Sequence, residues 1–436
     1  MFMGNISYFC TMKLFERHLK ERITFISIII ICLLSVLTTA HATNSSCNSD
    51  ATSCNTTNGE QAQTEVQQDS ITISLLTCGP RNNVYSLYGH TAIRYQNTTQ
   101  GIDLAINYGV FSFDKPFFVL RFVFGLTDYE MGIMYFSDFM REYAPTGCGV
   151  FQQVLNLQPA EKEAIAKAFD VNYKIENRTY RYNYLYDNCT TRARDIIANN
   201  ISGKIVYATS NKCGMSYRNL IRQYNNTHRW ARFGNDLLLG IGADKHTSLT
   251  EQQFLPENLE HDFSKAKIQA ANGVTRPLVK AEYWVLPKVS TTTPHTNMSS
   301  PSIVFAIIGF IIVTLTIVEH YTKRNFWGAD IIILTADGIC GLILLAMVFS
   351  QHPTVRVNMQ ILLLNPLNII LLYQSIKSLR QGYVSKWLKI WTTLIILFLI
   401  GGLFQSYAEG MYYVASSLLI RYTSKYATNR INYKTK

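Results

Sequence analysis

The chain has 436 residues, of which 48% are hydrophobic, and a formal net charge of +11 at pH 7. This length allows two or three domains with a sizeable core. The positive charge does not indicate a nucleic-acid-binding protein, because the sequence contains no Lys/Arg tract, zinc-ligand spacing or nucleotide-binding loop. Membrane proteins collect Lys and Arg at their cytoplasmic ends, which explains the charge without nucleic acid.

The N-terminus predicts an export signal. The charged stretch MKLFERHLKERI precedes the apolar run TFISIIIICLLSVL, and TTAHA ends it with a small-x-small pattern. We expect residues 1–42 to be a signal peptide or, alternatively, an uncleaved anchor helix, and either one exports the region that follows. Residues 43–69 are polar and poor in large apolar residues, which predicts a flexible lead-in.

Residues 70–290 mix strand and helix patterns, which predicts an exported α+β domain. Strands are expected at 71–77, 89–95, 101–113, 150–157, in the tyrosine alternation of 180–186, and as a closing pair within 271–286. Helices are expected at 158–174, at 189–199 after a cap at Asp187 or Asn188, and within 217–244.

Two aromatic-rich segments, 115–125 and 128–143, are expected to be helices or loops. Their phenylalanines are expected to belong to the core rather than to an acyl channel: Phe117, Phe118, Phe122 and Phe124.

An all-α membrane domain is expected at 302–421, after a Ser/Thr/Pro linker at 291–301. Five apolar segments predict about five helices, at 302–320, 329–350, 358–377, 388–405 and 408–421. The basic residues gather in the loops that an exported N-terminal domain would place in the cytoplasm, which agrees with the positive-inside rule. Residues 422–436 are then a cytoplasmic tail.

Cysteine usage fits an oxidising compartment. Six cysteines lie in the exported region, and their pairing stays open, although Cys47 and Cys54 would close a short loop. Cys340 lies in a membrane segment.

Cys189 is the candidate nucleophile, because a thiol at the start of a helix is ionised by unpaired N–H groups and the helix dipole. Arg192 and Arg194 follow in the first turns and would add positive charge. His90, on an expected strand, is the candidate base, and Asn107 is the candidate residue that orients its ring. Backbone N–H groups at the helix start could receive an oxyanion.

Each of these residues also has an ordinary structural interpretation. His90 could be a strand histidine with satisfied hydrogen bonds, Cys189 a disulfide half or a buried thiol, and Asn107 a hydrogen-bonded strand residue. Arg94 could be a salt-bridge partner, and Asp187 only a cap. The ordered combination favours catalysis, and the sequence shows no metal-ligand cluster.

Three polar residues lie near the outer ends of membrane segments: His352, Asn358 and Asn365. Polar groups in such positions are commonly paired or functional. We expect them to bind a lipid head group or to brace the exported domain, with helix capping as the alternative.

Several motifs resemble the lipoprotein N-acyltransferase family of Bacteroidetes: LLTCGPRNNVYSLYGHTAIRY, INYGVFSF, GLTDYEMG, FQQVLNL, ENRTYRYNYLYDNCTTRARDII and, in the membrane half, HPTVRVNMQILLLNPL. The resemblance covers residues 71–200 well and the membrane half more loosely. The order of His before Asn-Cys also resembles circularly permuted papain-like (NlpC-type) domains. In one departure, Gln152 stands where an acidic residue is expected, so it receives no role.

The resemblance implies a periplasmic catalytic domain on the bacterial inner membrane that moves an acyl chain from a phospholipid, through a cysteine thioester, to the N-terminal amine of diacylated lipoproteins. It implies no cofactor and no metal. The catalytic residues would be Cys189, His90 and Asn107. The substrate-binding candidates are Arg94, Tyr85, Asn188, Arg192, His352 and Asn358.

Two other functions use the same residues. The first is a membrane-tethered cysteine peptidase or amidase that acts on peptidoglycan. The second is a non-catalytic membrane receptor or assembly protein, which a disulfide at Cys189 would favour.

The loop charges generate a prediction of topology. Alkaline phosphatase fused after Lys436 should be inactive, because the C-terminal tail is expected in the cytoplasm, whereas a fusion within QHPTV (351–355) should be active. An active C-terminal fusion would contradict the count of five helices.

Overall fold

The computed structural model describes residues 70–81, 86–111, 116–208, 214–289 and 299–434. The expected signal or anchor at 1–42, the lead-in at 43–69, Tyr85 and most of the linker at 291–301 lie outside the described residues.

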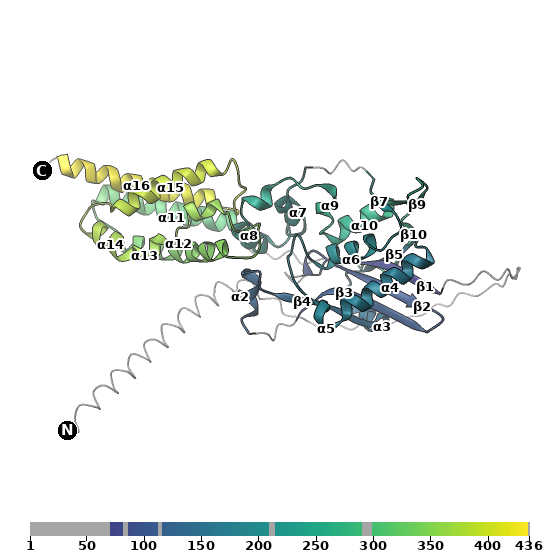
Figure 1. Ribbon diagram of the computed structural model, residues 1–436. Coiled ribbons are helices and arrows are strands. Elements are labelled where there is room, and N and C mark those ends of the chain that lie inside the picture. Colours follow the sequence, from purple (N-terminus) through teal and green to yellow (C-terminus); the bar gives the residue numbers. More distant parts are fainter. Residues whose placement is uncertain (1–69, 82–85, 112–115, 209–213, 290–298, 435–436) are drawn as a thin grey trace, which may run out of the picture. The chain divides into compact units, whose positions relative to one another are not determined.

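An antiparallel seven-stranded sheet organises the exported domain, in the order β10-β5-β1-β2-β3-β4-β6 (Figure 1). Its strands are β1 (Ile71–Cys78), β2 (His90–Asn97), β3 (Ile102–Val110), β4 (Asp128–Tyr135), β5 (Val150–Leu155), β6 (Thr179–Arg181) and β10 (Val279–Leu286). A second sheet joins β7 (Lys204–Val206), β8 (Lys267–Gln269) and β9 (Thr275–Pro277).

The alternation of β2 sends its side chains into two separate cores, as expected for a strand covered on both faces. Ile93 belongs to the core formed with α4, α6 and α10, whereas Ala92 belongs to the core formed with α3. The helices of this domain are α2 (Phe118–Val123), α3 (Phe136–Tyr143), α4 (Pro159–Tyr173), α5 (Ile175–Arg178), α6 (Cys189–Ala198), α7 (Tyr217–Tyr224), α8 (Arg229–Leu238), α9 (Leu249–Gln252) and α10 (Pro256–Lys265). Short 3₁₀ turns lie at Ala144–Thr146 and Ile241–Asp244.

Three of the predicted elements are different in the structure. Residues 128–143 form strand β4 followed by helix α3, because the first half alternates between the two faces of the sheet and the second half has helical spacing. The tyrosine alternation yields only the three-residue β6, since the chain then turns through a bridge between Asn183 and Asp187. The closing pair is not a hairpin, because β9 and β10 join different sheets.

The prediction that the phenylalanines of α2 and its flanks lie in the core is wrong for two of them. Phe117 is 79% exposed and Phe122 is 37% exposed.

The C-terminal part is helical, and its long helices run side by side as a bundle (Figure 1). Its helices are α11 (Pro301–Thr322), α12 (Trp327–Val348), α13 (Leu367–Ile370), α14 (Leu372–Arg380), α15 (Lys386–Gly401) and α16 (Met411–Lys434), with a 3₁₀ turn at Met359–Leu362. Among the described residues, α11 and α12 are long and apolar enough to cross a membrane.

The segment expected as the third span is broken. Met359–Ile370 and Leu372–Arg380 meet at an angle of 80°, and they would count as a third span only if taken together. Two glycines of α12 allow the broken segment to pack directly against that helix. A Cβ on Gly338 would lie 2.5 Å from Ile369 N, and one on Gly341 would lie 2.4 Å from Pro366 N. The expected tail after residue 421 continues as helix α16.

A buried ion pair ties α12 to α16. Arg421 donates to both carboxylate oxygens of Asp330, at 2.7 and 2.9 Å, and both side chains are fully buried. Charged groups in a membrane protein are expensive unless paired in this way, so the pair specifies which faces of the two helices meet.

The last turn of α8 is capped by side chains of the C-terminal part. A helix leaves its final carbonyls without intrahelical partners, and these must be satisfied when buried. Gln360 Nε2 donates to Asp236 O (2.9 Å), Asn358 Nδ2 donates to Leu237 O (2.8 Å), and Gln405 Nε2 donates to Leu239 O (3.2 Å). These amides therefore join the exported domain to the membrane domain.

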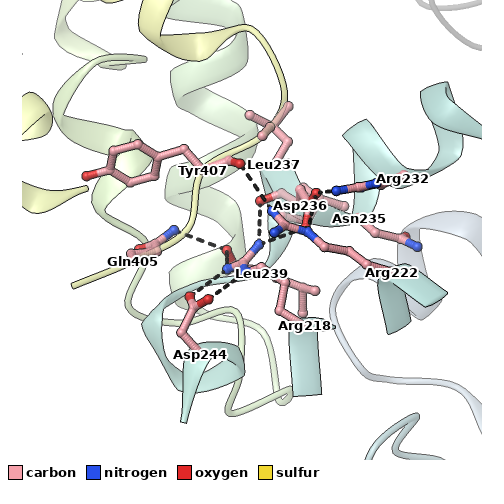
Figure 2. A network of polar contacts seen from close by, with 12 residues as sticks. Arg218, Arg222, Arg232, Asn235, Asp236, Leu237, Leu239, Asp244, Gln405 and Tyr407 are labelled. Atoms are coloured by element: carbon pink, nitrogen blue, oxygen red, sulfur yellow. Dashed lines mark hydrogen bonds and ion pairs between the residues drawn. The ribbon is translucent and has the colours of Figure 1, made fainter. Parts of the chain in front are cut away.

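Figure 2 shows the ionic part of the same junction. The guanidinium of Arg218 is fully buried between Asp236 (3.1 Å) and Asp244 (2.9 Å) and also donates to Leu239 O (2.9 Å). Arg222 bonds the other side of Asp236 at 3.0 Å and reaches Tyr407 O at 3.4 Å. Each of Arg218 and Arg222 thus bonds to at least one carboxylate and one backbone carbonyl.

This junction generates a stability prediction. Gln405→Ala removes a donor to Leu239 O and leaves the N–H of Met359 without the Gln405 Oε1 acceptor that it has at 2.8 Å. We expect a loss of about 1–3 kcal/mol in the free energy of unfolding, since an unpaired buried amide costs about that much. Thermal unfolding in detergent measures it. The matched change Gln381→Ala, at an exposed position, should have little effect, and equal melting of both variants would contradict the prediction.

Candidate cysteine–histidine site

Asn188 places the candidate nucleophile at the first position of α6. Its side-chain oxygen accepts from the N–H groups of Thr190 and Thr191, both at 2.9 Å, and its backbone N–H donates to the Thr191 hydroxyl at 2.9 Å. Its side-chain nitrogen donates to Tyr184 O (3.0 Å) and Phe254 O (2.9 Å). Of the two caps expected from the sequence, the structure uses Asn188 rather than Asp187.

The structure brings together the three residues predicted to be catalytic. Asn107 Oδ1 lies 3.0 Å from His90 Nε2, and the thiol of Cys189 is close enough to the His90 ring for each group to shift the pKa of the other. Because Nε2 faces Asn107, Nδ1 is the nitrogen left to exchange a proton with the sulfur. Cys189 and His90 are half-buried, and Asn107 is buried.

The surroundings stabilise a thiolate–imidazolium pair. Burial alone would raise the pKa of the Cys189 thiol, but the charge and hydrogen bond of His90, with hydrogen bonds from the Thr91 N–H and the Thr190 hydroxyl, lower it to about 7. Burial alone would lower the pKa of His90, but the Cys189 charge and the hydrogen bonds to Cys189 and Asn107 raise it. The predicted contribution of the arginines is absent from these effects.

Both arginines near Cys189 have other partners. Arg192 forms a bidentate pair with Asp187, at 2.6 and 2.8 Å, and stacks over Tyr180 at 3.6 Å. Arg194 pairs with Asp195 at 2.7 Å. The thiol is therefore activated by its histidine and by N–H and O–H donors, not by a cationic cluster.

Two contacts that the sequence did not reveal hold strand and helix together at the site. The hydroxyls of Thr91 and Thr190, both buried, lie 3.1 Å apart and join β2 to α6. Gly109 interrupts the pairing of β3 with β4 at a bulge and has a φ of 110°. A Cβ there would lie 3.5 Å from Cys189 Cβ, so the bulge places this glycine backbone beside the thiol.

An aromatic wall formed by Phe111, Tyr129 and Tyr182 lies near Cys189, since a Cβ on Gly109 would be 3.5 Å from Cys189 Cβ and 3.8 Å from Tyr129. Tyr129 stacks on Tyr182 with ring centres 4.0 Å apart, and Phe111 stacks on Tyr129 at 4.8 Å. Burial, and to a lesser extent the neighbouring Cys189 charge, raises the pKa of Tyr129, so this hydroxyl stays neutral. The aromatic wall thus presents apolar ring faces and carries no charge.

Tyr88 connects this site to the junction with the membrane domain. Its hydroxyl accepts from Asn225 Nδ2 (2.7 Å) and Asn235 Nδ2 (3.0 Å), and Asn235 directly precedes the capped turn of α8. Tyr88 is two residues before His90, so its bonds to Asn225 and Asn235 fix the segment that enters β2 to the junction. The sequence shows Tyr88 within YSLYGH, but its partners Asn225 and Asn235 are far away in the chain and are revealed only by the fold.

Arg94 has the salt bridge that was its ordinary alternative. It donates to both oxygens of Asp103, at 2.8 and 2.6 Å, and to Gln152 Oε1 at 2.9 Å, and it stacks over Phe136 at 3.6 Å. Gln152, which received no role, thus helps to hold Arg94. A part for Arg94 in substrate binding stays a prediction.

The polar residues of the membrane loops lie in structural contacts. His352 donates from Nε2 to Phe122 O at 3.2 Å, Asn358 caps α8, and Asn365 caps the broken helix, where its own N–H donates to Asp337 at 3.0 Å. This geometry fits the bracing role, and head-group binding stays a prediction. Within the described part of the chain, no group of three or more His, Cys, Asp or Glu could hold a metal ion.

Two family models match the chain. The Lnb N-terminal periplasmic domain matches residues 58–226, and the Lnb transmembrane domain matches residues 293–432. The first match contains Cys189, His90 and Asn107, and the second contains the amides that cap α8. No curated protein and no solved structure matches the chain.

The pKa of Cys189 generates a test. Iodoacetamide alkylation of the Cys189 peptide, followed by mass spectrometry over a pH series, should have a midpoint near the pKa of about 7, because the thiolate is lost as pH falls through that value. His90→Ala should raise the midpoint, since burial would then be opposed only by the hydrogen bonds from the Thr91 N–H and the Thr190 hydroxyl. His261→Ala, on α10, is the control and should leave the midpoint unchanged. An unchanged midpoint in His90→Ala would contradict the pairing.

Proposed function

Because the chain belongs to the Lnb family, we propose that it is a membrane-bound acyltransferase that acylates the N-terminal amine of lipoproteins. Family membership makes it a membrane protein with an N-terminal periplasmic domain. The observation that carries the proposal is the free thiol of Cys189, whose pKa is lowered to about 7 by a histidine that Asn107 orients. The membrane is the bacterial inner membrane, the donor is a phospholipid, and the acceptor is a diacylated lipoprotein.

In the first step the thiolate of Cys189 attacks the carbonyl carbon of a phospholipid ester. In this proposal the backbone N–H of Cys189 receives the oxyanion, since the N–H groups of Thr190 and Thr191 are occupied by the Asn188 side chain. The carbon–oxygen bond breaks, and the His90 imidazolium gives its proton to the leaving lysophospholipid oxygen. The products are a thioester on Cys189 and a lysophospholipid.

In the second step the α-amine of the lipoprotein attacks the thioester carbonyl. Neutral His90 takes a proton from the amine, the carbon–sulfur bond breaks, and the thiolate is restored beside the imidazolium. Release of the amide product returns the enzyme to its starting state. Asn107 keeps the ring in position through both steps by its bond to Nε2.

We also propose that the periplasmic domain is a circularly permuted papain-like (NlpC-type) fold. In support, the cysteine begins a helix that packs against an antiparallel sheet, and the histidine lies on an adjacent strand. The histidine precedes the cysteine in the chain, as the permutation requires.

The peptidase or amidase alternative would use the same pair of residues. Two observations favour acyl transfer: the aromatic wall of Phe111, Tyr129 and Tyr182 beside the thiol, and the junction that fixes the site to a membrane domain. A non-catalytic role is disfavoured by Cys189, which is free in the structure and ionises near neutral pH.

Substitutions test the proposal. Cys189→Ala, Cys189→Ser and His90→Ala should leave co-expressed lipoproteins with a free N-terminal amine. The cysteine variants cannot form the thioester, and His90→Ala cannot carry out the proton transfers. Loss of a general base alone lowers a rate by about 10²–10⁴-fold. Asn107→Ala should only slow the reaction, since it removes an orienting contact. The readout is the mass of the lipoprotein N-terminal peptide.

Cys148→Ala is the matched cysteine control and should remain active, because this thiol bonds Thr146 and not His90. Incubation of the wild type with phospholipid should add one acyl mass to Cys189, removable by hydroxylamine. Acylation of lipoproteins by Cys189→Ala would disprove the mechanism.

A further inference from the structure

The short helix α2 and the residues that flank it expose several large apolar side chains. Phe117 is 79% exposed, Leu120 is 55% exposed, Phe122 is 37% exposed and Leu126 is 38% exposed. Phe117 also has a left-handed backbone with φ 58°, which is uncommon for a bulky residue. A contiguous apolar cluster on a domain surface marks an interaction site more often than a single exposed side chain does.

The polar contacts of this segment are turned toward the protein. Arg121 donates to Leu126 O at 3.2 Å and lies 3.8 Å from Asp128. Arg181 binds Asp128 at 2.6 Å and also donates to Gln351 Oε1 at 2.9 Å. The charges are therefore paired within the protein, whereas Phe117 and Leu120 are mainly exposed and the Phe122 ring centre lies 6.2 Å from the His352 ring centre.

The segment is fixed to the end of a membrane helix. Gln351, three residues after α12, donates its N–H to Phe124 O at 2.9 Å, and His352 donates from Nε2 to Phe122 O at 3.2 Å. A Cβ on Gly125 would lie 3.2 Å from His352 N, so the two backbones are in close contact. Phe349, the residue that ends α12, is 75% exposed. The exposed apolar side chains of the α2 segment thus continue the apolar surface of α12 at its outer end.

We infer that α2 and the preceding Phe117 form a membrane-contact element of the periplasmic domain, with Phe117 and Leu120 inserted among the lipids of the outer leaflet. Lipid is the occupant that this continuity favours over a protein partner, because α12 is long and apolar enough to cross a membrane and the residues after it bond to the α2 segment. Apolar side chains carried by a short segment at the head-group boundary gain their binding energy by burial among the acyl chains.

The position of α2 in the chain suggests what the membrane contact does, and this role rests on the proposed acyl transfer. α2 lies between β3, which passes Cys189 at Gly109, and β4, which carries Tyr129 of the aromatic wall. The segment that enters the lipid is therefore continuous with residues that lie near the thiol. We expect it to guide a phospholipid ester from the leaflet toward Cys189.

Photocrosslinking in the full chain tests the lipid contact without reference to catalysis. Benzoylphenylalanine in place of Phe117, with the protein in vesicles of phosphatidylethanolamine and a minority of phosphatidylglycerol, should give phospholipid adducts by mass spectrometry. Val274, 64% exposed in the turn between β8 and β9, is the control position and should give none. Absence of lipid adducts at Phe117, or equal adducts at both positions, would overturn the inference.

A second measurement tests the guiding role. The variant Phe117→Ser/Leu120→Ser should keep the wild-type pH midpoint of Cys189 alkylation, which shows a folded site, and should form the acyl thioester from vesicle phospholipid several-fold more slowly. An unchanged rate would overturn the guiding role. If the wild type gives lipid adducts at position 117 but never forms a thioester, the proposed acyl transfer fails while the membrane contact stands.

Discussion

The carboxamide of Asn188 is the constraint on which the site depends. It uses all four of its hydrogen-bonding groups at once: the oxygen accepts two backbone N–H groups of α6, and the nitrogen donates to Tyr184 O and Phe254 O. A carboxylate would lose both donors, and a hydroxyl could not reach both sides. Because this one side chain joins the helix start to two loops, it determines where the sulfur of Cys189 lies.

The loops that Asn188 joins lead to the membrane domain. Phe254 packs in a core with Leu185 and Tyr217, and Met347 and Val355 of the C-terminal part belong to the same core. Tyr88 makes a second connection through Asn225 and Asn235. The nucleophile and the histidine are thus positioned through separate contacts that both end at the same junction. Under the proposed acyl transfer, this arrangement would hold the reacting atoms in a fixed position relative to the membrane domain.

The proximity of the three residues predicted to be catalytic could be anticipated from the sequence because the signals that single them out are local. A cap followed by cysteine, a strand with His90, and a strand with Asn107 each lie within a few residues. The contacts that support them are not local. Thr91 and Thr190 are 99 positions apart, and the donors to α8 lie more than 100 positions after it. Arg192 was expected to activate the thiol, but Asp187, which was expected to be a cap, neutralises it. The outward orientation of Phe117 could not be predicted either, because composition alone suggests burial for an aromatic run.

The capping of α8 also has a consequence for the order of assembly. Ribosomes make the chain from its N-terminus, so His90 and Cys189 are synthesised and exported long before Asn358, Gln360 and Gln405, the amides that satisfy the last turn of α8. Until the final membrane loop is in place, these carbonyls lack their partners and the segment that holds Tyr88 is incomplete. The contacts that satisfy the last turn of α8 are therefore complete only after Gln405, more than 160 positions after that turn, has been made.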